Sequence, residues 1–113
     1  MQERRNQKRE HLVHYLRVFD SRTDTLTGQL VDITPNGIML ISNRHIEPGS
    51  MFQFRMDFPE EVLGKTHLEF QSECVWSRVD INPDMYAVGF TLKNMLREDV
   101  DIIQALIDEY RDS

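Results

Sequence analysis

The sequence is poor in the residues that define several classes of protein. Its 113 residues include a single cysteine, so no disulfide can form within the chain, and only five glycines and four prolines, too few for a fibrous or low-complexity protein. No charge-free apolar run approaches the roughly 20 residues of a membrane-spanning helix, and the N-terminus lacks the apolar core of a signal peptide. With 40% hydrophobic and 28% charged residues, the chain is expected to form one compact cytoplasmic domain.

Charge is distributed unevenly along the chain. The first nine residues contain one acidic and four basic side chains, the basic ones being Arg4, Arg5, Lys8 and Arg9. This local charge of +3 leaves −9 on the remainder of a chain whose net charge is −6. The acidic body argues against a general affinity for nucleic acid or membrane surfaces. Because short basic tails are usually solvated, we expect residues 1–10 to form a flexible leader ahead of one folded domain at 11–113.

Between His11 and Leu92 the apolar residues form short runs separated by turn-forming clusters. The runs are rich in Val, Ile, Phe and Tyr, which favours strands. Six strands are expected, within residues 11–20, 26–33, 37–42, 51–58, 67–79 and 85–92. In the fourth, every second residue from Phe52 to Phe58 is apolar, the period of a strand with one buried face. Since a small domain cannot cover exposed sheet edges, the pattern predicts a mainly β fold, a closed six-stranded antiparallel barrel.

The last segment follows a helical period and predicts an α-helix over about residues 97–111. One stripe recurs at three- and four-residue spacing, namely Val100, Ile103, Leu106, Ile107 and Tyr110. We expect this stripe to pack across the barrel. Ile102 lies beside the stripe, where it either widens the packed face or marks a surface for a partner.

The basic leader contains the first segment with a specific chemistry, RNQKR. Arg5 and Arg9 stand four residues apart, flanked by Arg4 and Lys8. A guanidinium group can bind a phosphate with two hydrogen bonds, or read the O6 and N7 edge of a guanine, better than lysine can. The spacing therefore suits a ligand that contains guanine and phosphate.

The second such segment is DITPNG, at the end of the second expected strand. It contains Asp32, Thr34 and Gly37. The aspartate can accept hydrogen bonds from the N1 and N2 donors of guanine, while the hydroxyl and the backbone beside the glycine can contact phosphate or base. The alternative is an ordinary turn, with both side chains bonded to their own backbone and Gly37 at positive φ.

Taken together in this order, the two motifs and the strand pattern resemble the PilZ domain, the bacterial receptor for cyclic di-GMP. The resemblance spans essentially the whole chain. RNQKR matches the family's arginine motif, and DITPNG matches its Asp/Asn-x-Ser-x-x-Gly motif with Thr34 in place of serine. The later segments CVWSRVD and MYAVGF resemble the family's last strands. Threonine keeps the hydroxyl and adds a methyl group, so its effect on binding strength is left open.

The resemblance implies a non-enzymatic receptor module. Cyclic di-GMP would bind the outer surface of the barrel, contacted by Arg5, Arg9, Asp32, Thr34 and Gly37, with Arg4 and Lys8 as secondary contacts. The ligand would order the leader, and the change would pass to an unidentified partner protein. No other cofactor is implied.

Other interpretations of the sequence are weaker. The four histidines have no companion ligands at metal-binding spacing, and Cys74, which shares the apolar face of its strand with Trp76, is expected to be a buried, unreactive thiol. We therefore expect neither a metal site nor catalytic residues. A small nucleic-acid-binding barrel is disfavoured by the acidic body. A PilZ-like adaptor that binds only protein stays open as the main alternative.

Overall fold

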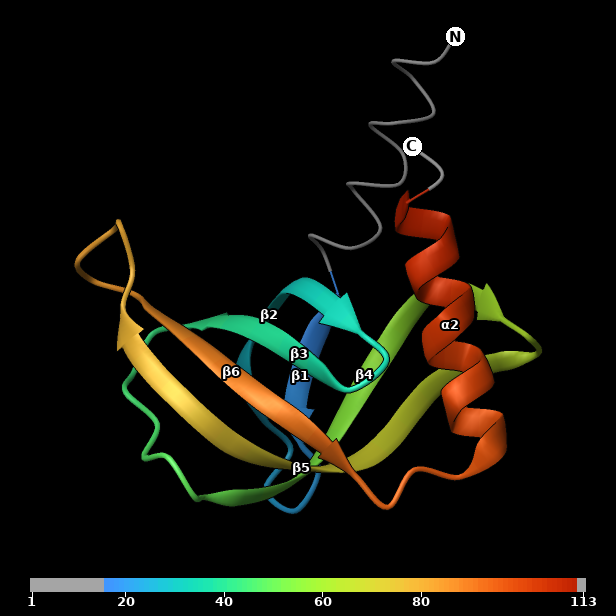
Figure 1. Cartoon of the computed structure of the whole chain (residues 1–113), viewed down its shortest axis with the longest axis horizontal. Helices are drawn as coiled ribbons and strands as arrows, with labels where there is room; N and C mark the ends of the chain where they lie inside the picture. The colour runs from blue at the N-terminus through green and yellow to red at the C-terminus, as the bar shows by residue number, and fades with distance from the viewer. Residues whose placement is uncertain (1–15, 112–113) are drawn as a thin grey trace, which may run out of the picture.

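A computed structural model describes residues 16–111 of the chain, with side chains up to Glu109. It contains six strands and one helix (Figure 1): β1 (Arg17–Asp20), β2 (Thr25–Thr34), β3 (Gly37–Ser42), β4 (Met51–Val62), β5 (Lys65–Val79), β6 (Tyr86–Lys93) and α2 (Arg97–Arg111). The predicted six strands and closing helix are confirmed. The first part of the first expected strand, residues 11–15, lies outside the described residues.

The strands close into a barrel in the order β1-β2-β3-β6-β5-β4, and every neighbouring pair is antiparallel. Pairing of β1 with β4 completes the ring, with Val18 opposite Met56. Among residues 16–111 each strand therefore has a hydrogen-bonded neighbour on both sides, as expected for a domain of this size.

The hairpin between β4 and β5 is longer than the sequence predicts. The pattern predicts strands that end at residue 58 and resume at residue 67, but β4 continues to Val62 and β5 begins at Lys65. Leu63 and Gly64 form a two-residue turn with φ angles of 51° and 81°. Positive φ at both positions is typical of the tight turns that join antiparallel strands. The strands extend because this turn, rather than Pro59, reverses the chain.

The core of the barrel is built from the inward-facing residues of all six strands. Phe54 is fully buried, with its ring centroid 5.0 Å from that of Phe90 and 5.9 Å from that of Phe70, both at steep interplanar angles. Such edge-to-face pairs stabilise a core beyond the area they bury. Phe52 and Phe58, on the same strand, are partly buried against this cluster.

Helix α2 packs against β2 and β4 and covers one side of the barrel (Figure 1). Its buried residues are Ile102, Ile103, Leu106 and Ile107, whereas Val100 is 42% exposed. The predicted stripe is therefore wrong at Val100, because the buried face is rotated toward Ile102. Ile102 widens the packed face and is not a partner surface. Within residues 16–111 no helix has the length and apolar character required to cross a membrane.

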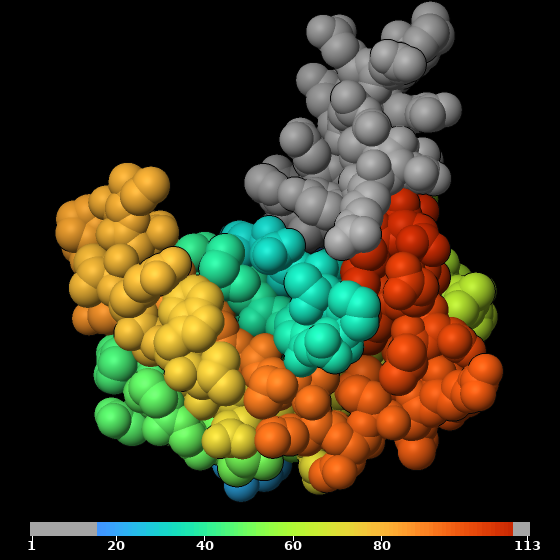
Figure 2. Space-filling model, viewed as in Figure 1, coloured from blue at the N-terminus to red at the C-terminus, as the bar shows by residue number. Residues whose placement is uncertain are grey.

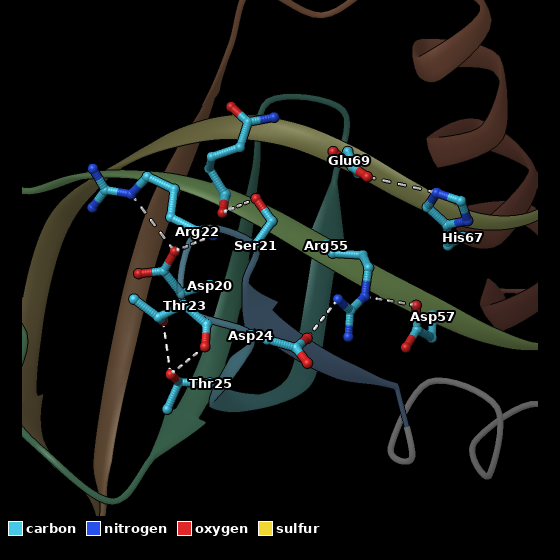
Figure 3. A network of polar contacts seen from close by, with 11 residues as sticks. Asp20, Ser21, Arg22, Thr23, Asp24, Thr25, Arg55, Asp57, His67 and Glu69 are labelled. Atoms are coloured by element: carbon cyan, nitrogen blue, oxygen red, sulfur yellow. Dashed lines mark hydrogen bonds and ion pairs between the residues drawn. The ribbon is translucent and has the colours of Figure 1, made fainter.

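Polar contacts fasten the turn between β1 and β2 to β4 (Figure 3). The Ser21 hydroxyl donates to the Gln53 carbonyl at 2.9 Å. The Arg55 guanidinium donates to Asp24 at 2.7 Å and to Asp57 at 3.1 Å. Exposed ion pairs of this kind stabilise a fold only slightly, so their main effect is to fix the geometry of the turn.

Candidate ligand-binding face

A β-bulge in β2 determines which way the predicted site residues point. The pairing of β2 with β3 shifts register between Leu30 and Asp32, so Val31 is an extra residue in the ladder. As a result Leu30 and Ile33, three residues apart, are both buried, and Asp32 and Thr34 are both exposed on the outer surface. Without the bulge, strict alternation would place Asp32 on the same side as Leu30.

Thr34 and Gly37 form the ends of the β2–β3 turn and are paired across it. The Thr34 hydroxyl accepts from the Gly37 amide at 3.1 Å and donates to the Gly37 carbonyl at 3.3 Å. The Asp32 carboxylate accepts from the amide of Ile33 at 2.9 Å. Both polar side chains thus bond to nearby backbone, as the ordinary-turn interpretation predicts, while their remaining lone pairs stay accessible to solvent.

Gly37 is required for a different reason from the one that the turn interpretation gives. The expectation of positive φ is wrong, since Gly49 and Gly64 are the described glycines with that conformation. A Cβ added to Gly37 would lie 2.5 Å from the carbonyl oxygen of Phe90. Gly37 therefore allows β3 and β6 to approach closely at this end of the barrel.

The structure adds Trp76 and Arg78 to the same outer face. Asp32 is opposite Met39, Met39 is opposite Gly89, and Gly89 is opposite Trp76, so one row crosses four strands. The indole lies directly on Gly89, and the guanidinium of Arg78 stacks on it at 4.6 Å from the ring centroid. Sequence alternation assigned Trp76 to the buried face. A second bulge, between Cys74 and Trp76, overturns that assignment.

The described residues of this face carry both acidic and basic side chains. Asp32 contributes a carboxylate, and on the neighbouring row Glu73 is paired with Lys93 at 3.3 Å. Arg78 is exposed, and its guanidinium lies against the Trp76 ring. A ligand with two phosphates would require further positive charge. Space-filling representation shows the β2–β3 turn on the surface beside α2 (Figure 2).

The basic residues Arg4, Arg5, Lys8 and Arg9 lie outside the described residues, as does the predicted leader boundary at residue 10. Their contacts therefore stay predictions. The structure does show where the chain that follows the leader joins the barrel. The amide of Leu30 donates to the carbonyl of Leu16 at 2.9 Å, so the described chain begins beside β2, two residues before Asp32.

Cys74 agrees with its expected role as a buried thiol. It is 1% exposed, and its sulfur lies 3.6 Å from the carbonyl oxygens of Ile46 and Trp76. Burial raises the pKa of the Cys74 thiol, which lowers its reactivity at neutral pH. Within residues 16–111 no three His, Cys, Asp or Glu side chains cluster closely enough to hold a metal ion.

Comparisons with known proteins agree with this architecture. The structure of the Bacillus subtilis inhibitor of motility, MotI/DgrA, superposes with a TM-score of 0.69 at 15% identity, over 87% of this chain and 47% of that one. The chain thus spans about half the length of that protein. The PilZ domain of YcgR from Escherichia coli, solved with c-di-GMP, gives a TM-score of 0.59 at 12% identity, over 88% and 85% of the two chains.

At these identities the two structures show a shared fold. No curated protein matches the sequence significantly. The model of the PilZ domain family matches residues 3–109, nearly the full length. The chain belongs to the PilZ domain family.

Proposed function

We propose that this protein is a cyclic di-GMP receptor that binds its ligand on the outer face around the β2–β3 turn. The observation that carries the proposal is the outward exposure of Asp32 and Thr34 by the bulge at Val31, next to the point where the described chain begins. Membership of the PilZ domain family and the c-di-GMP in the YcgR structure support the choice of ligand.

In this proposal each motif recognises a different part of the ligand. Arg5 and Arg9 bind phosphate and the O6 and N7 edge of guanine, with Arg4 and Lys8 adding positive charge. Asp32 accepts from the N1 and N2 donors of a guanine, while Thr34 and the backbone at Gly37 form the side of the site contributed by the barrel. The stacked pair Trp76 and Arg78 contributes further contacts to the ligand from the same face.

Recognition of this kind acts as a signal rather than as catalysis. The leader closes over the ligand and is ordered by it, and the changed surface is read by a partner protein. No residue is assigned a catalytic role.

The stacked indole of Trp76 and guanidinium of Arg78 present a flat cationic surface. Such a surface favours a planar, anionic ligand such as a guanine nucleotide over a neutral one.

The test is calorimetric titration of the protein with cyclic di-GMP at two salt concentrations, with GMP as a control ligand. Micromolar or tighter binding is expected, and Arg9→Ala should weaken it by at least about tenfold because a charged bidentate contact is lost. Arg22→Ala is the matched control, since Arg22 is an exposed arginine in the β1–β2 turn, paired with Asp20. Its affinity should stay within about twofold of wild type.

Two results would contradict the proposal. The first is the absence of binding by a protein whose circular dichroism and cooperative unfolding show that it is folded. The second is equal loss of affinity in Arg9→Ala and Arg22→Ala, which would indicate a nonspecific charge effect. Absence of binding would leave the protein-binding adaptor as the better hypothesis.

A further inference from the structure

A groove lies on the side of the barrel where α2 passes the β4–β5 hairpin. It has a volume of about 220 Å³ and an apolar floor made by Val62, Leu63, Ala105 and Leu106. Leu63 is 66% exposed at the tip of the hairpin, so the apolar floor extends to the surface of the protein. In Figure 1 the hairpin lies beside α2.

Three glutamates line the same groove: Glu60, Glu61 and Glu109. All three are exposed. Within residues 16–109 none of them is in an ion pair, whereas the exposed carboxylates of Asp24 and Asp57 both pair with Arg55. An apolar floor with an acidic rim fits a segment that combines apolar and basic side chains.

The N-terminal end of β1 is directed toward this groove. In the antiparallel pairing of β1 with β4, Val18 lies opposite Met56, so moving backward along β1 corresponds to moving forward along β4. Continuing this register by two residues would set Leu16 opposite Phe58, on the side from which β4 runs on to Glu60 and Glu61. The residues that precede Leu16 have the required composition, since 11–15 read HLVHY and 4–9 read RRNQKR.

We propose that this groove is the resting site of the protein's own basic leader when no ligand is bound. Apolar side chains of residues 11–15 cover Leu63 and the half-buried Val62 and Ala105. The basic residues of 4–9 pair with the three glutamates. Arg9 is seven positions before Leu16, a span of at most about 25 Å. That length reaches either the groove or Asp32, which lies on the other strand that flanks Leu16.

A consequence follows for ligand binding, and this consequence alone rests on the proposed function. The same arginines cannot occupy the groove and the ligand at once. The apparent affinity is then lower than the intrinsic affinity by the fraction of molecules whose leader is free. If the leader is docked in about 70–90% of molecules, removing the groove contact should tighten ligand binding about threefold to tenfold.

The first test needs no ligand. A nitroxide is attached to Gln7→Cys in 15N-labelled protein of residues 1–113, and wild-type protein treated with the same reagent controls for labelling at buried Cys74. The amide signals of Leu63 and Glu109 should broaden relative to the reduced label, and should recover at 1 M salt. Unbroadened signals at both positions would overturn the proposal.

Charge-matched variants separate the groove from general electrostatics. The groove variant is Glu60→Gln/Glu61→Gln/Glu109→Gln. The control variant is Glu69→Gln/Asp84→Asn/Asp101→Asn, which removes the same number of charges from exposed positions outside the groove. Broadening should fall by at least half in the groove variant and persist in the control. If the groove variant does not fold, the deciding measurement is the recovery of the Leu63 and Glu109 amide signals at 1 M salt in the protein that carries only Gln7→Cys.

Two further measurements distinguish the leader from a second copy of the chain and test its competition with the ligand. A mixture of 15N-labelled wild type and nitroxide-labelled protein at natural abundance should show no broadening, because broadening there would identify a second copy as the occupant and overturn the proposal. In calorimetry with cyclic di-GMP, the groove variant should bind about threefold to tenfold more tightly than wild type and the control within about twofold. If wild type does not bind, the proposed function fails, while the label still tests docking.

Discussion

The indole of Trp76 rests on the backbone of Gly89, its partner across the β5–β6 ladder. A Cβ added to Gly89 would lie 2.2 Å from the indole Nε1 and 2.3 Å from Cε2. Only a glycine leaves room for the ring. Gly89 therefore sets the position of Trp76, and through it the position of Arg78, whose guanidinium stacks on the same ring.

The first prediction is that Gly89→Ala displaces the indole and destabilises the barrel by about 1–3 kcal/mol, the usual cost of inserting a methyl group into a packed contact. Urea unfolding measures the change. The fluorescence emission can be assigned to Trp76 because it is the single tryptophan, and it should shift to longer wavelength as the displaced indole meets more water. In a Trp76→Ala background the same substitution should cost much less, since the clash is gone. An equal cost in both backgrounds would contradict the assignment.

The second prediction concerns the hydroxyl of Thr34. Thr34→Val keeps the shape but removes the group that bonds to both the amide and the carbonyl of Gly37. We expect a loss of about 0.5–1.5 kcal/mol in the free energy of unfolding, as for a typical hydrogen bond. Exchange of the Gly37 amide, followed by NMR, should become faster. Thr34→Ser keeps the hydroxyl and should leave both quantities close to wild type, and equal effects of serine and valine would show that the methyl group matters instead.

Much of the fold could be predicted because alternation and helical period are local properties of the sequence. The alternation from Phe52 to Phe58 correctly indicates a half-buried strand, and the change of period after residue 96 correctly indicates a helix. What failed depends on pairing partners. The bulges at Val31 and before Trp76 exist only because a neighbouring strand has one residue fewer. Each reverses the face of the residues that follow it in its strand.

The residues of the candidate site likewise divide into those that a local sequence pattern reveals and those that depend on strand pairing. Asp32, Thr34 and Gly37 could be found from the sequence because they fall within six consecutive residues. Trp76 and Arg78 reach that face only through a register that crosses β3 and β6, and no local pattern contains that information. The available signal was Gly89, a small residue in a strand of large ones, which marks a close approach by another group.

The third prediction follows from the rotated face of α2. Ile102 is 3% exposed and Val100 is 42% exposed, the reverse of what the three- and four-residue stripe predicts. Ile102→Ala should destabilise the protein by about 2–5 kcal/mol, because it opens a cavity where the helix meets the barrel. Val100→Ala should change the free energy of unfolding by no more than about 0.5 kcal/mol. Thermal unfolding followed by circular dichroism compares the two, and similar losses would place the stripe back at Val100.

The last prediction is a pH dependence carried by Cys74. Burial raises the pKa of its thiol in the folded protein above the ordinary value of about 8.5 that the unfolded chain retains. Above that pH the unfolded chain releases this proton while the folded protein keeps it. The contribution to stability is therefore complete below about pH 8.5 and decreases as the pH rises further.

Urea unfolding from about pH 7 to pH 10 should show a steeper decline in stability for wild type than for Cys74→Ala, in which this proton is missing. The difference between the two slopes isolates Cys74 from the tyrosines and lysines that titrate in the same range. Alkylation by iodoacetamide supplies an independent check, because the native thiol should react far more slowly than the same thiol in urea. Parallel stability curves, or equal alkylation rates, would mean that the thiol is accessible in the folded protein.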